Sequence, residues 1–272
     1  MEYKKETIAT IIFNQLNAEK TSLKKQFQAS KDKIGFFYID NLLPENLAKD
    51  IHRVFPSKDQ SVKRKDLREF KFVAFQMNKY DSLLEEVIYA FQDPRIINII
   101  SEICTLDNLY ADPHLYAGGL SLMDKGGYLN PHLDNSHDKD RNNWRVLNLL
   151  YYVTPDWKVE NGGNLELWPN SLKNDPIVIE SKFNRLVVMA THQNSWHSVS
   201  KVLVDKPRCC VSNYYFSDTP VLTSDTFHVT SFRGRPGEKI KDLLLRIDNS
   251  ARNFARTLFK KGIRENPHQY KK

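Results

Sequence analysis

The fold of this chain is decided by four short runs: Leu147-Asn-Leu-Leu-Tyr-Tyr-Val153, Asn164-Leu-Glu-Leu-Trp168, Arg185-Leu-Val-Val-Met-Ala190 and Cys209-Cys-Val-Ser-Asn-Tyr-Tyr-Phe216. Each run is apolar or alternates apolar with polar residues. Turn-forming residues punctuate this part of the chain, at Gly126-Gly127, Thr154-Pro155, Asn161-Gly-Gly163 and Pro169-Asn170. Short strands with such turns predict a β-sandwich or β-barrel between about residues 109 and 216.

Helical patterns precede this β-rich segment. Ile8, Ile11, Ile12, Leu16 and Leu23 recur near helical spacing and predict a helix over residues 1–32. Residues 57–68 are charged and lack periodicity, so we expect a mobile loop there. The other expected elements are a strand at 35–39, a helix from Pro44 to Val54, and two helices within 81–105 that separate near Asp93-Pro94.

One more helix is expected at the C-terminal end, over residues 237–262. Its apolar residues recur at helical spacing, which predicts a face that packs on the rest of the protein. They are Ile240, Leu243, Leu244, Ile247, Phe254 and Leu258. Together the patterns predict an α+β chain, mainly β, with N-terminal and C-terminal helices packed on a β core.

The composition is typical of a soluble globular protein. The chain has 272 residues, 40% of them hydrophobic and 27% charged, which is enough for one substantial core. No stretch approaches the roughly 18 apolar residues of a membrane span, and the N-terminal segment lacks a secretory signal pattern. Cys104, Cys209 and Cys210 fit neither a disulfide framework nor a metal-ligand spacing. A cytoplasmic location is therefore expected.

Positive charge is concentrated near the C-terminus. The formal net charge is +7, whereas residues 233–272 alone hold twelve Lys/Arg against four Asp/Glu, an excess of +8. Such a tail can bind nucleic acid or an acidic partner, or it can be a solvated helical face. We favour the solvated face, because the tail contains no recognisable nucleic-acid motif.

Two histidines and an aspartate have the spacing of a metal site. His132 and Asp134 stand two residues apart near the end of an expected strand, where such side chains point to the same side. Ser195-Trp196-His197 supplies a third candidate ligand. Two imidazoles and one carboxylate leave positions on iron for a chelating cosubstrate and dioxygen, as in non-haem Fe(II) oxygenases. A His-x-Asp pair alone, however, is also common on protein surfaces.

Arg208 strengthens the oxygenase interpretation. It lies at the start of the last expected strand, after His197 in the chain. The planar guanidinium can make two charge-assisted hydrogen bonds to a carboxylate. 2-Oxoglutarate carries a second carboxylate beyond the end that chelates iron, and we interpret Arg208 as its partner. A surface position on the strand is the alternative.

The stretch from Met123 to Phe216 resembles the prolyl 4-hydroxylase-like branch of the Fe(II)/2-oxoglutarate-dependent dioxygenase superfamily. The resemblance says little about residues 1–100 or 221–272. The shared features occur in the family's order: Gly127-Tyr-Leu-Asn-Pro-His132-Leu-Asp134-Asn, Leu149-Leu-Tyr-Tyr152, Trp157 with Gly162-Gly-Asn-Leu-Glu-Leu-Trp168, Phe183-Asn-Arg-Leu-Val-Val, His197-Ser-Val and Arg208.

The resemblance implies an oxidoreductase with a double-stranded β-helix (jelly-roll, cupin-like) core. It implies Fe(II) held by His132, Asp134 and His197, with 2-oxoglutarate and dioxygen as cosubstrates and ascorbate as a candidate reductant. The implied reaction hydroxylates an unactivated C–H bond and decarboxylates 2-oxoglutarate to succinate and carbon dioxide. Because Asp134 is present, hydroxylation is favoured over the halogenation of relatives that lack this carboxylate.

Other site residues follow from the same resemblance. Arg208 would bind the distal carboxylate of 2-oxoglutarate, with support from the Tyr152 hydroxyl. Tyr214 matches an aromatic that lines the pocket, and Asn148 is one polar residue in an apolar run that points toward cosubstrate or substrate. For Tyr152 and Tyr214 a role in the core is the alternative. Two departures blur the cosubstrate pocket: Leu120-Ser-Leu-Met123 stands where many relatives have a tyrosine, and Cys210 where many have a hydroxyl residue.

The sequence patterns divide the chain into three parts, and two other histidines compete as metal ligands. Residues 1–105 form a helical and strand region that buttresses the barrel, 106–220 the oxygenase core, and 221–272 a basic helical extension. His137 and His192 are alternative metal ligands. We prefer His197 to His192, because Trp196-His197-Ser198-Val199 matches the family's pattern.

The substrate is the least determined part of the prediction. Arg145 and Arg233 are candidate contacts for an anionic substrate, and a surface charge is the alternative for Arg145. We expect a polar substrate: a free amino acid, a peptidyl side chain such as proline, or another small metabolite. The rival functions are a nucleic-acid demethylase that uses the basic tail and an inactive barrel that acts as a binding module. The pattern leaves the oligomeric state open.

Overall fold

A computed structural model of the chain describes residues 3–258 and residue 270. In this range the helices are α1 (Lys5–Ser30), α2 (Glu45–Arg53), α3 (Ser82–Ala90), α4 (Pro94–Cys104) and α5 (Lys239–Leu258). The strands are β1 (Phe36–Ile39), β2 (Val62–Lys65), β3 (Glu69–Ala74), β4 (Leu109–Tyr110), β5 (Gly119–Met123), β6 (Tyr128–Leu133), β7 (Trp144–Tyr152), β8 (Leu165–Leu167), β9 (Pro169–Leu172), β10 (Ile177–Ile179), β11 (Arg185–Ala190), β12 (His197–Val199), β13 (Arg208–Ser217) and β14 (Ser231–Phe232).

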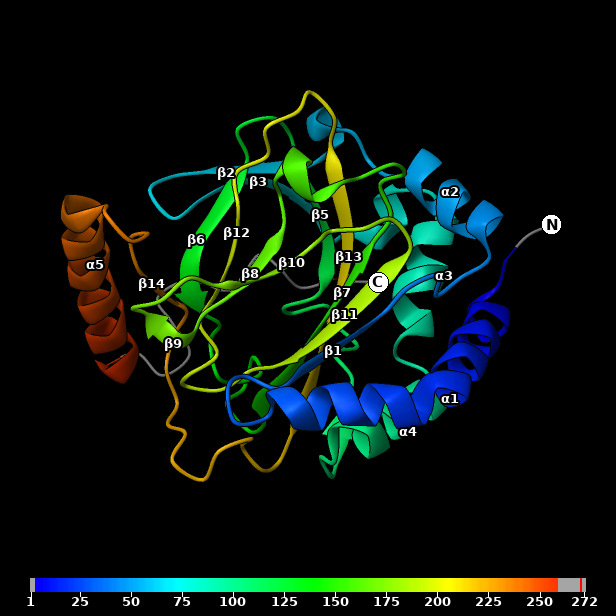
Figure 1. Ribbon diagram of the computed structural model, residues 1–272, viewed down its shortest axis with the longest axis horizontal. Helices are drawn as coiled ribbons and strands as arrows, with labels where there is room; N and C mark the ends of the chain where they lie inside the picture. Colours follow the sequence, from blue (N-terminus) through cyan, green and yellow to red (C-terminus); the bar gives the residue numbers. More distant parts are fainter. Residues whose placement is uncertain (1–2, 259–269, 271–272) are drawn as a thin grey trace.

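All of these strands except β9 form one antiparallel, 13-stranded sheet that curls into a half-barrel (Figure 1). Its order is β1-β11-β7-β13-β5-β3-β6-β12-β8-β10, and β14, β2 and β4 pair with β6, β3 and β13 at the sides. This architecture confirms the predicted mainly-β core with flanking helices, and it is the jelly-roll type that the resemblance implied. The expected C-terminal helix is present as α5, but the part expected beyond residue 258 lies outside the described residues.

Strand β7 shows how the sequence builds the barrel wall. Successive side chains along a strand point to opposite faces of the sheet. Those of Leu147, Leu149 and Tyr151 point to one face and belong to the large apolar cluster shared with the helices. Asn148 and Leu150 leave on the opposite face and line the barrel interior. One apolar run therefore serves two surfaces, which explains why it lacks a polar outer face.

Helices α1, α3 and α4 cover the outer face of the sheet (Figure 1). The expected break near Asp93-Pro94 is confirmed: Asp93 caps α4 by accepting a hydrogen bond from the backbone N–H of Arg95, and Pro94 occupies the first turn. The helices bury the apolar stripe of α1, including Ile8, Ile12 and Leu16. They fix the outer wall and leave the inner face to the site.

The expectation of a mobile loop over 57–68 is wrong. Val62–Lys65 and Glu69–Ala74 form a hairpin, and β3 is inserted between β5 and β6 in the sheet. The pattern was missed because β2 has no apolar alternation: Lys63 and Lys65 are exposed, and the partly buried residue between them is Arg64. Backbone pairing, rather than apolar burial, holds this strand in place.

Helix α5 also differs from expectation. Its predicted apolar stripe does not pack on the barrel: the exposed fraction is 80% for Ile240 and 68% for Phe254. The face toward the barrel instead contains the buried Leu245 and Asn249. The side-chain oxygen of Asn249 accepts a hydrogen bond from the backbone N–H of Phe232, and its amide nitrogen donates one to the Phe232 carbonyl. Polar contacts therefore carry much of this attachment. Among the described helices, none combines the length and the apolar content that crossing a bilayer requires.

Candidate active site

The structure brings together His132, Asp134 and His197 at one end of the barrel interior. His132 is the penultimate residue of β6, and Asp134 directly follows the strand. His197 begins the neighbouring antiparallel strand β12, directly across from His132. The Asp134 carboxylate oxygens lie 3.7 Å from Nε2 of His132 and 3.7 Å from Nε2 of His197. One donor atom from each residue lies within 4.8 Å of the others. These donors surround a common point rather than bonding to each other, because 3.7 Å exceeds a hydrogen bond.

Backbone carbonyls orient both imidazoles. Nδ1 of His132 lies 3.0 Å from the carbonyl oxygen of Asn130, and Nδ1 of His197 lies 2.9 Å from that of Ser195. A carbonyl only accepts, so each Nδ1 carries the proton and donates it. The unprotonated Nε2 atoms then face Asp134, which is the tautomer that binds a metal.

Electrostatics keep two of the donors, His132 and Asp134, in metal-binding protonation states. Burial, reinforced by the proximity of His197, lowers the pKa of His132 to about 3, so its ring is neutral at neutral pH. Burial alone would raise the pKa of Asp134, but His197, Arg145 and His132 outweigh it and the pKa is lowered. Oδ2 of Asp134 is buried and has no hydrogen-bond partner in the described structure. A buried, charged, unpaired oxygen between two imidazole nitrogens fits a cation well.

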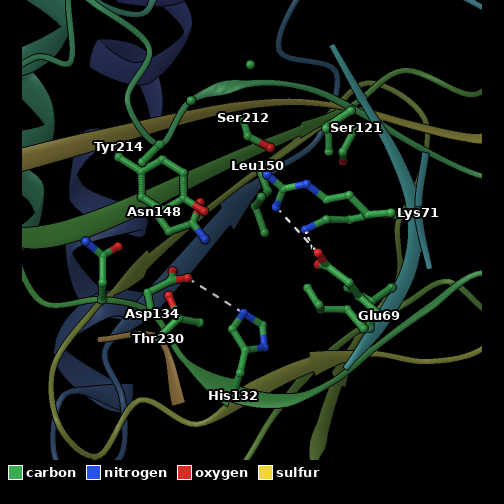
Figure 2. Close-up of a pocket in the computed structure, with 18 of the residues that line it drawn as sticks. Glu69, Lys71, Ser121, His132, Asp134, Asn148, Leu150, Ser212, Tyr214 and Thr230 are labelled. Carbon is green, nitrogen blue, oxygen red and sulfur yellow. Dashed lines mark hydrogen bonds and ion pairs between the residues drawn. The ribbon is translucent and has the colours of Figure 1, made fainter. Parts of the chain in front are cut away.

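A cavity of about 450 Å³ extends from this triad (Figure 2). Arg208 also lines it, from the start of β13, and is 97% buried. Its guanidinium stacks over the Tyr152 ring at 4.7 Å, and its Nε donates to Ser181 Oγ. A buried arginine that reaches the cavity is able to bind a carboxylate.

The remaining predicted residues divide between the cavity and other places. Asn148, Arg145 and Tyr214 line the cavity, and Asn148 Oδ1 is buried without a partner in the part of the chain described. Tyr152 is fully buried, and its contact with the site is the ring beneath Arg208. Arg233 does not line this cavity; it forms a two-point ion pair with Asp242 on α5 (2.6 and 3.1 Å), which argues against its predicted pocket role.

The competing histidines lie outside the triad. Nε2 of His192 bonds the carbonyl of Ile34, and its Nδ1 accepts from the backbone N–H of Asn194, so both nitrogens are engaged elsewhere. His137 lines the cavity, with Nδ1 2.6 Å from the carbonyl oxygen of Asp138, but it is not part of the group of converging donors.

Sequence reasoning missed five charged residues that line the cavity: Arg64, Arg68, Glu69 and Lys71 on the β2–β3 hairpin, and Arg252 on α5. The sign that could have found two of them is the position of Arg64 and Lys71 opposite each other in the strand register, which places both side chains on one face. It becomes visible once the segment is known to be a hairpin.

Comparisons with known proteins agree with this geometry. Residues 118–216 match the family model described as the 2OG-Fe(II) oxygenase superfamily. A prolyl hydroxylase of Trichoplax adhaerens, in complex with a hypoxia inducible factor peptide fragment, aligns at TM-score 0.53 and 20% identity, over 77% of this chain and 96% of that one. A prolyl 4-hydroxylase of Phytophthora capsici aligns at TM-score 0.57 and 16% identity, over 96% and 82%. No curated protein sequence matches this chain significantly.

Fold, triad and family match define the class: the chain contains a 2OG-Fe(II) oxygenase domain and is an oxidoreductase of the dioxygenase type that uses Fe(II) and 2-oxoglutarate. Solved prolyl hydroxylase structures share this fold.

Proposed function

We propose that His132, Asp134 and His197 hold the Fe(II), and that Arg208 binds the distal carboxylate of 2-oxoglutarate. The observation that carries this assignment is the convergence of two oriented Nε2 atoms on the unpartnered Asp134 oxygen, with the buried Arg208 lining the same cavity. Tyr152 supports Arg208 through its ring, and Asn148, which lines the same cavity, has a buried amide oxygen without a partner in the described structure.

The bound metal, with 2-oxoglutarate and dioxygen, supplies the oxidation of a C–H bond coupled to the release of succinate and carbon dioxide. The protein contributes orientation and a dry interior. Arg208 holds one end of the cosubstrate, so its other end is directed toward the triad. The barrel wall of Leu150, Leu165 and Val199 keeps water from the reacting centre.

We infer that the substrate is polar: a free amino acid, a peptidyl side chain such as proline, or another small metabolite. Arg145 and Tyr214 support this inference, because they line the cavity beside Asp134 and stack on each other at 4.4 Å. One structural neighbour holds a peptide fragment and another holds hygromycin B. In this proposal residues 106–220 supply the metal and 2-oxoglutarate ligands. Residues 1–105 buttress them and also add the β2–β3 hairpin to the cavity wall. In the 221–272 extension, residues 259–269, 271 and 272 lie outside the described residues.

Succinate release tests the proposal. Purified protein with Fe(II), ascorbate and 2-oxoglutarate is expected to form succinate slowly even without substrate, and a chelator should abolish this. His132→Ala, Asp134→Ala and His197→Ala should reduce it to background, whereas His114→Ala, an exposed histidine outside the cavity, should not. Wild-type rates in the Asp134→Ala variant would refute the assignment.

A further inference from the structure

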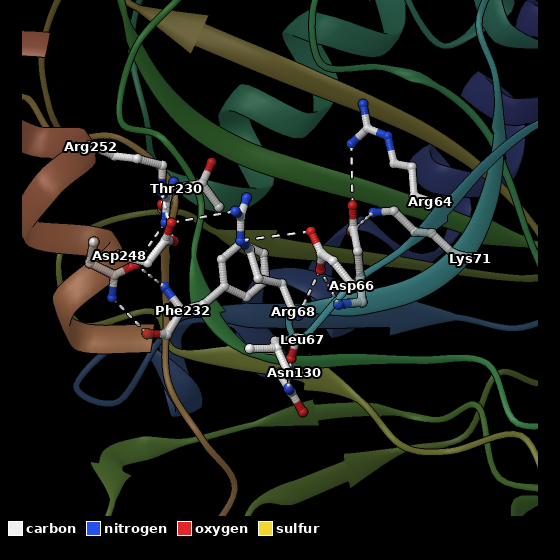
Figure 3. A network of polar contacts seen from close by, with 12 residues as sticks. Arg64, Asp66, Leu67, Arg68, Lys71, Asn130, Thr230, Phe232, Asp248 and Arg252 are labelled. Atoms are coloured by element: carbon white, nitrogen blue, oxygen red, sulfur yellow. Dashed lines mark hydrogen bonds and ion pairs between the residues drawn. The ribbon is translucent and has the colours of Figure 1, made fainter. Parts of the chain in front are cut away.

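The β2–β3 hairpin sends charged side chains into the cavity. Figure 2 shows Glu69 and Lys71 on the wall opposite Asn148 and Tyr214, and Figure 3 shows Arg64 beside Lys71. The exposed Lys65, next in the chain to Arg64, lies over the Phe70 ring instead. The strand therefore separates the cations that line the cavity from those that face solvent.

These three charges do not cancel. Lys71 Nζ lies 2.9 Å from one carboxylate oxygen of Glu69, and Arg64 Nη1 lies 3.4 Å from the other. One carboxylate thus serves two cations, which leaves a net positive charge on this wall. The neighbouring Arg68 and Arg252 are different, because two carboxylates balance them: Arg68 lies 3.8 Å from Asp66 and 3.4 Å from Asp248, and Arg252 lies 2.9 Å from Asp248 (Figure 3).

A second uncompensated cation lines the same cavity. Arg145 is 94% buried, and its Nε has no hydrogen-bond partner within the described structure. Its nearest acid is Asp134, at 3.6 Å, and the proposed function assigns that carboxylate to the metal. It likewise assigns Arg208 to 2-oxoglutarate. With the metal and 2-oxoglutarate assigned to these residues, the cavity lining still has excess positive charge in two places, at the β2–β3 wall and at Arg145.

Partly buried cations of this kind favour a ligand that neutralises them. Removing a charge from water is expensive unless an opposite charge replaces the lost hydration. A neutral substrate would fill the space and leave Lys71, Arg64 and Arg145 without that replacement. An anionic group instead gains charge-assisted hydrogen bonds that are about twice as strong as neutral ones. The cavity, at about 450 Å³ including the cosubstrate's share, suits a small molecule.

We infer that the substrate is a small molecule with a negatively charged group, a carboxylate or a phosphate, bound by Lys71 and Arg64 across the cavity from Tyr214. This inference rests on the proposed function, because it assumes that the metal and 2-oxoglutarate occupy the triad and Arg208. Glu69 acts as the internal partner of the two cations until the anion arrives.

Calorimetric titration tests the inference directly. Protein loaded with Mn(II) and saturating 2-oxoglutarate, without oxygen, is titrated with matched acid and neutral pairs: L-aspartate and L-asparagine, L-glutamate and L-glutamine, D-gluconate and D-glucose, phospho-L-serine and L-serine. At least one acid should bind, and its neutral partner should bind more weakly by about tenfold or more. The carboxylate and phosphate arms of the panel distinguish the two kinds of anion.

Variants locate the bound anion. Lys71→Gln and Arg64→Gln should each weaken binding of the acid by about 10- to 100-fold, as expected for the loss of one charged hydrogen bond. Glu69→Gln should strengthen it, because the competing carboxylate is removed. Lys65→Gln removes the same charge from the exposed face of the hairpin and should leave the affinity unchanged.

Three results would overturn the inference: no acid binds better than its neutral partner, Lys65→Gln weakens binding as much as Lys71→Gln, or Lys71→Gln weakens 2-oxoglutarate binding instead. Failure of the proposed function looks different. In that case wild-type protein shows no succinate formation dependent on Fe(II) and 2-oxoglutarate in the absence of any probe.

Discussion

His132 and His197 are register partners across the antiparallel strands β6 and β12, and their ring centroids lie 4.1 Å apart. Each ring is anchored in the same way, through Nδ1 to the carbonyl of the residue two positions before it. Backbone pairing and these two hydrogen bonds orient both rings independently of any metal contact. The donor set is therefore preorganised, and metal binding need not pay for ordering it.

Metal binding should raise the thermal stability of the protein. An ion that binds the native state at 100 times its Kd contributes about 2.7 kcal/mol. Mn(II), measured by differential scanning calorimetry, should increase the Tm of the wild type, and the increase should vanish in Asp134→Ala. His192→Ala is the matched control, because His192 is a buried histidine outside the triad. An equal Tm shift in Asp134→Ala and wild type would contradict the triad.

Arg208→Lys should weaken the enzyme's use of 2-oxoglutarate. Lysine keeps the charge but loses the planar fork, so the KM for 2-oxoglutarate should rise about 10- to 100-fold. Steady-state succinate formation over a range of 2-oxoglutarate concentrations measures this. Arg185→Lys is a suitable control, since Arg185 also begins a strand and binds a carboxylate, Asp40, but does not line the cavity. Equal changes in both variants would indicate a general structural effect rather than a carboxylate site.

The sequence was informative where chemistry coincides with strand periodicity. His132 and Asp134 stand two residues apart near the end of an expected strand, so alternation indicated that their side chains point to the same side. His197 and Arg208 were added to them by the order of the motifs in the family resemblance. The tertiary structure then needed to add only the pairing of β6 with β12.

The β2–β3 hairpin could not be predicted in the same way. Its inward side chains at Arg64 and Lys71 are charged, so no apolar signal marks the buried face. Strand β3 of this hairpin pairs with β5 and β6, which are distant from it in the sequence. The prediction that the apolar face of α5 packs on the barrel was wrong for the opposite reason. Apolar periodicity predicted the helix correctly, but it does not show whether another part of the protein covers the apolar face.

Asn184→Ala should destabilise the fold by about 2–4 kcal/mol. The side-chain oxygen of Asn184 accepts hydrogen bonds from the Tyr151 hydroxyl and the Leu43 N–H, and its amide donates to the Leu43 carbonyl. Truncation leaves these buried groups unpaired, at about 1–3 kcal/mol for each unsatisfied group. Its backbone is also left-handed, with φ at 60°, which asparagine tolerates better than alanine.

Urea denaturation measures this loss, and Asn184→Gly separates its two causes. Glycine relieves the left-handed strain but not the missing hydrogen bonds, so it should recover only part of the stability. Full recovery in Asn184→Gly would show that the backbone conformation, rather than the hydrogen bonds to Tyr151 and Leu43, accounts for the effect.

Glu69 should make stability depend on acid pH. Burial alone would raise its pKa, but Lys71 and Arg64 outweigh it and lower the pKa from 4.5 to about 2 in the folded protein. Between these values the unfolded chain binds more protons, so the stabilisation is complete above pH 4.5 and is lost as the pH falls toward 2. The shift corresponds to at most about 3 kcal/mol, less after solvent screening.

Glu69→Gln should therefore be less stable than the wild type at pH 7, by about 1–3 kcal/mol, and the difference should narrow from pH 4.5 to pH 3. Urea midpoints at several pH values measure it. Glu45→Gln, at an exposed glutamate, should show no comparable gap. A gap for Glu69→Gln that stays constant with pH would mean that packing, and not the charge shared with Lys71 and Arg64, accounts for the stabilisation.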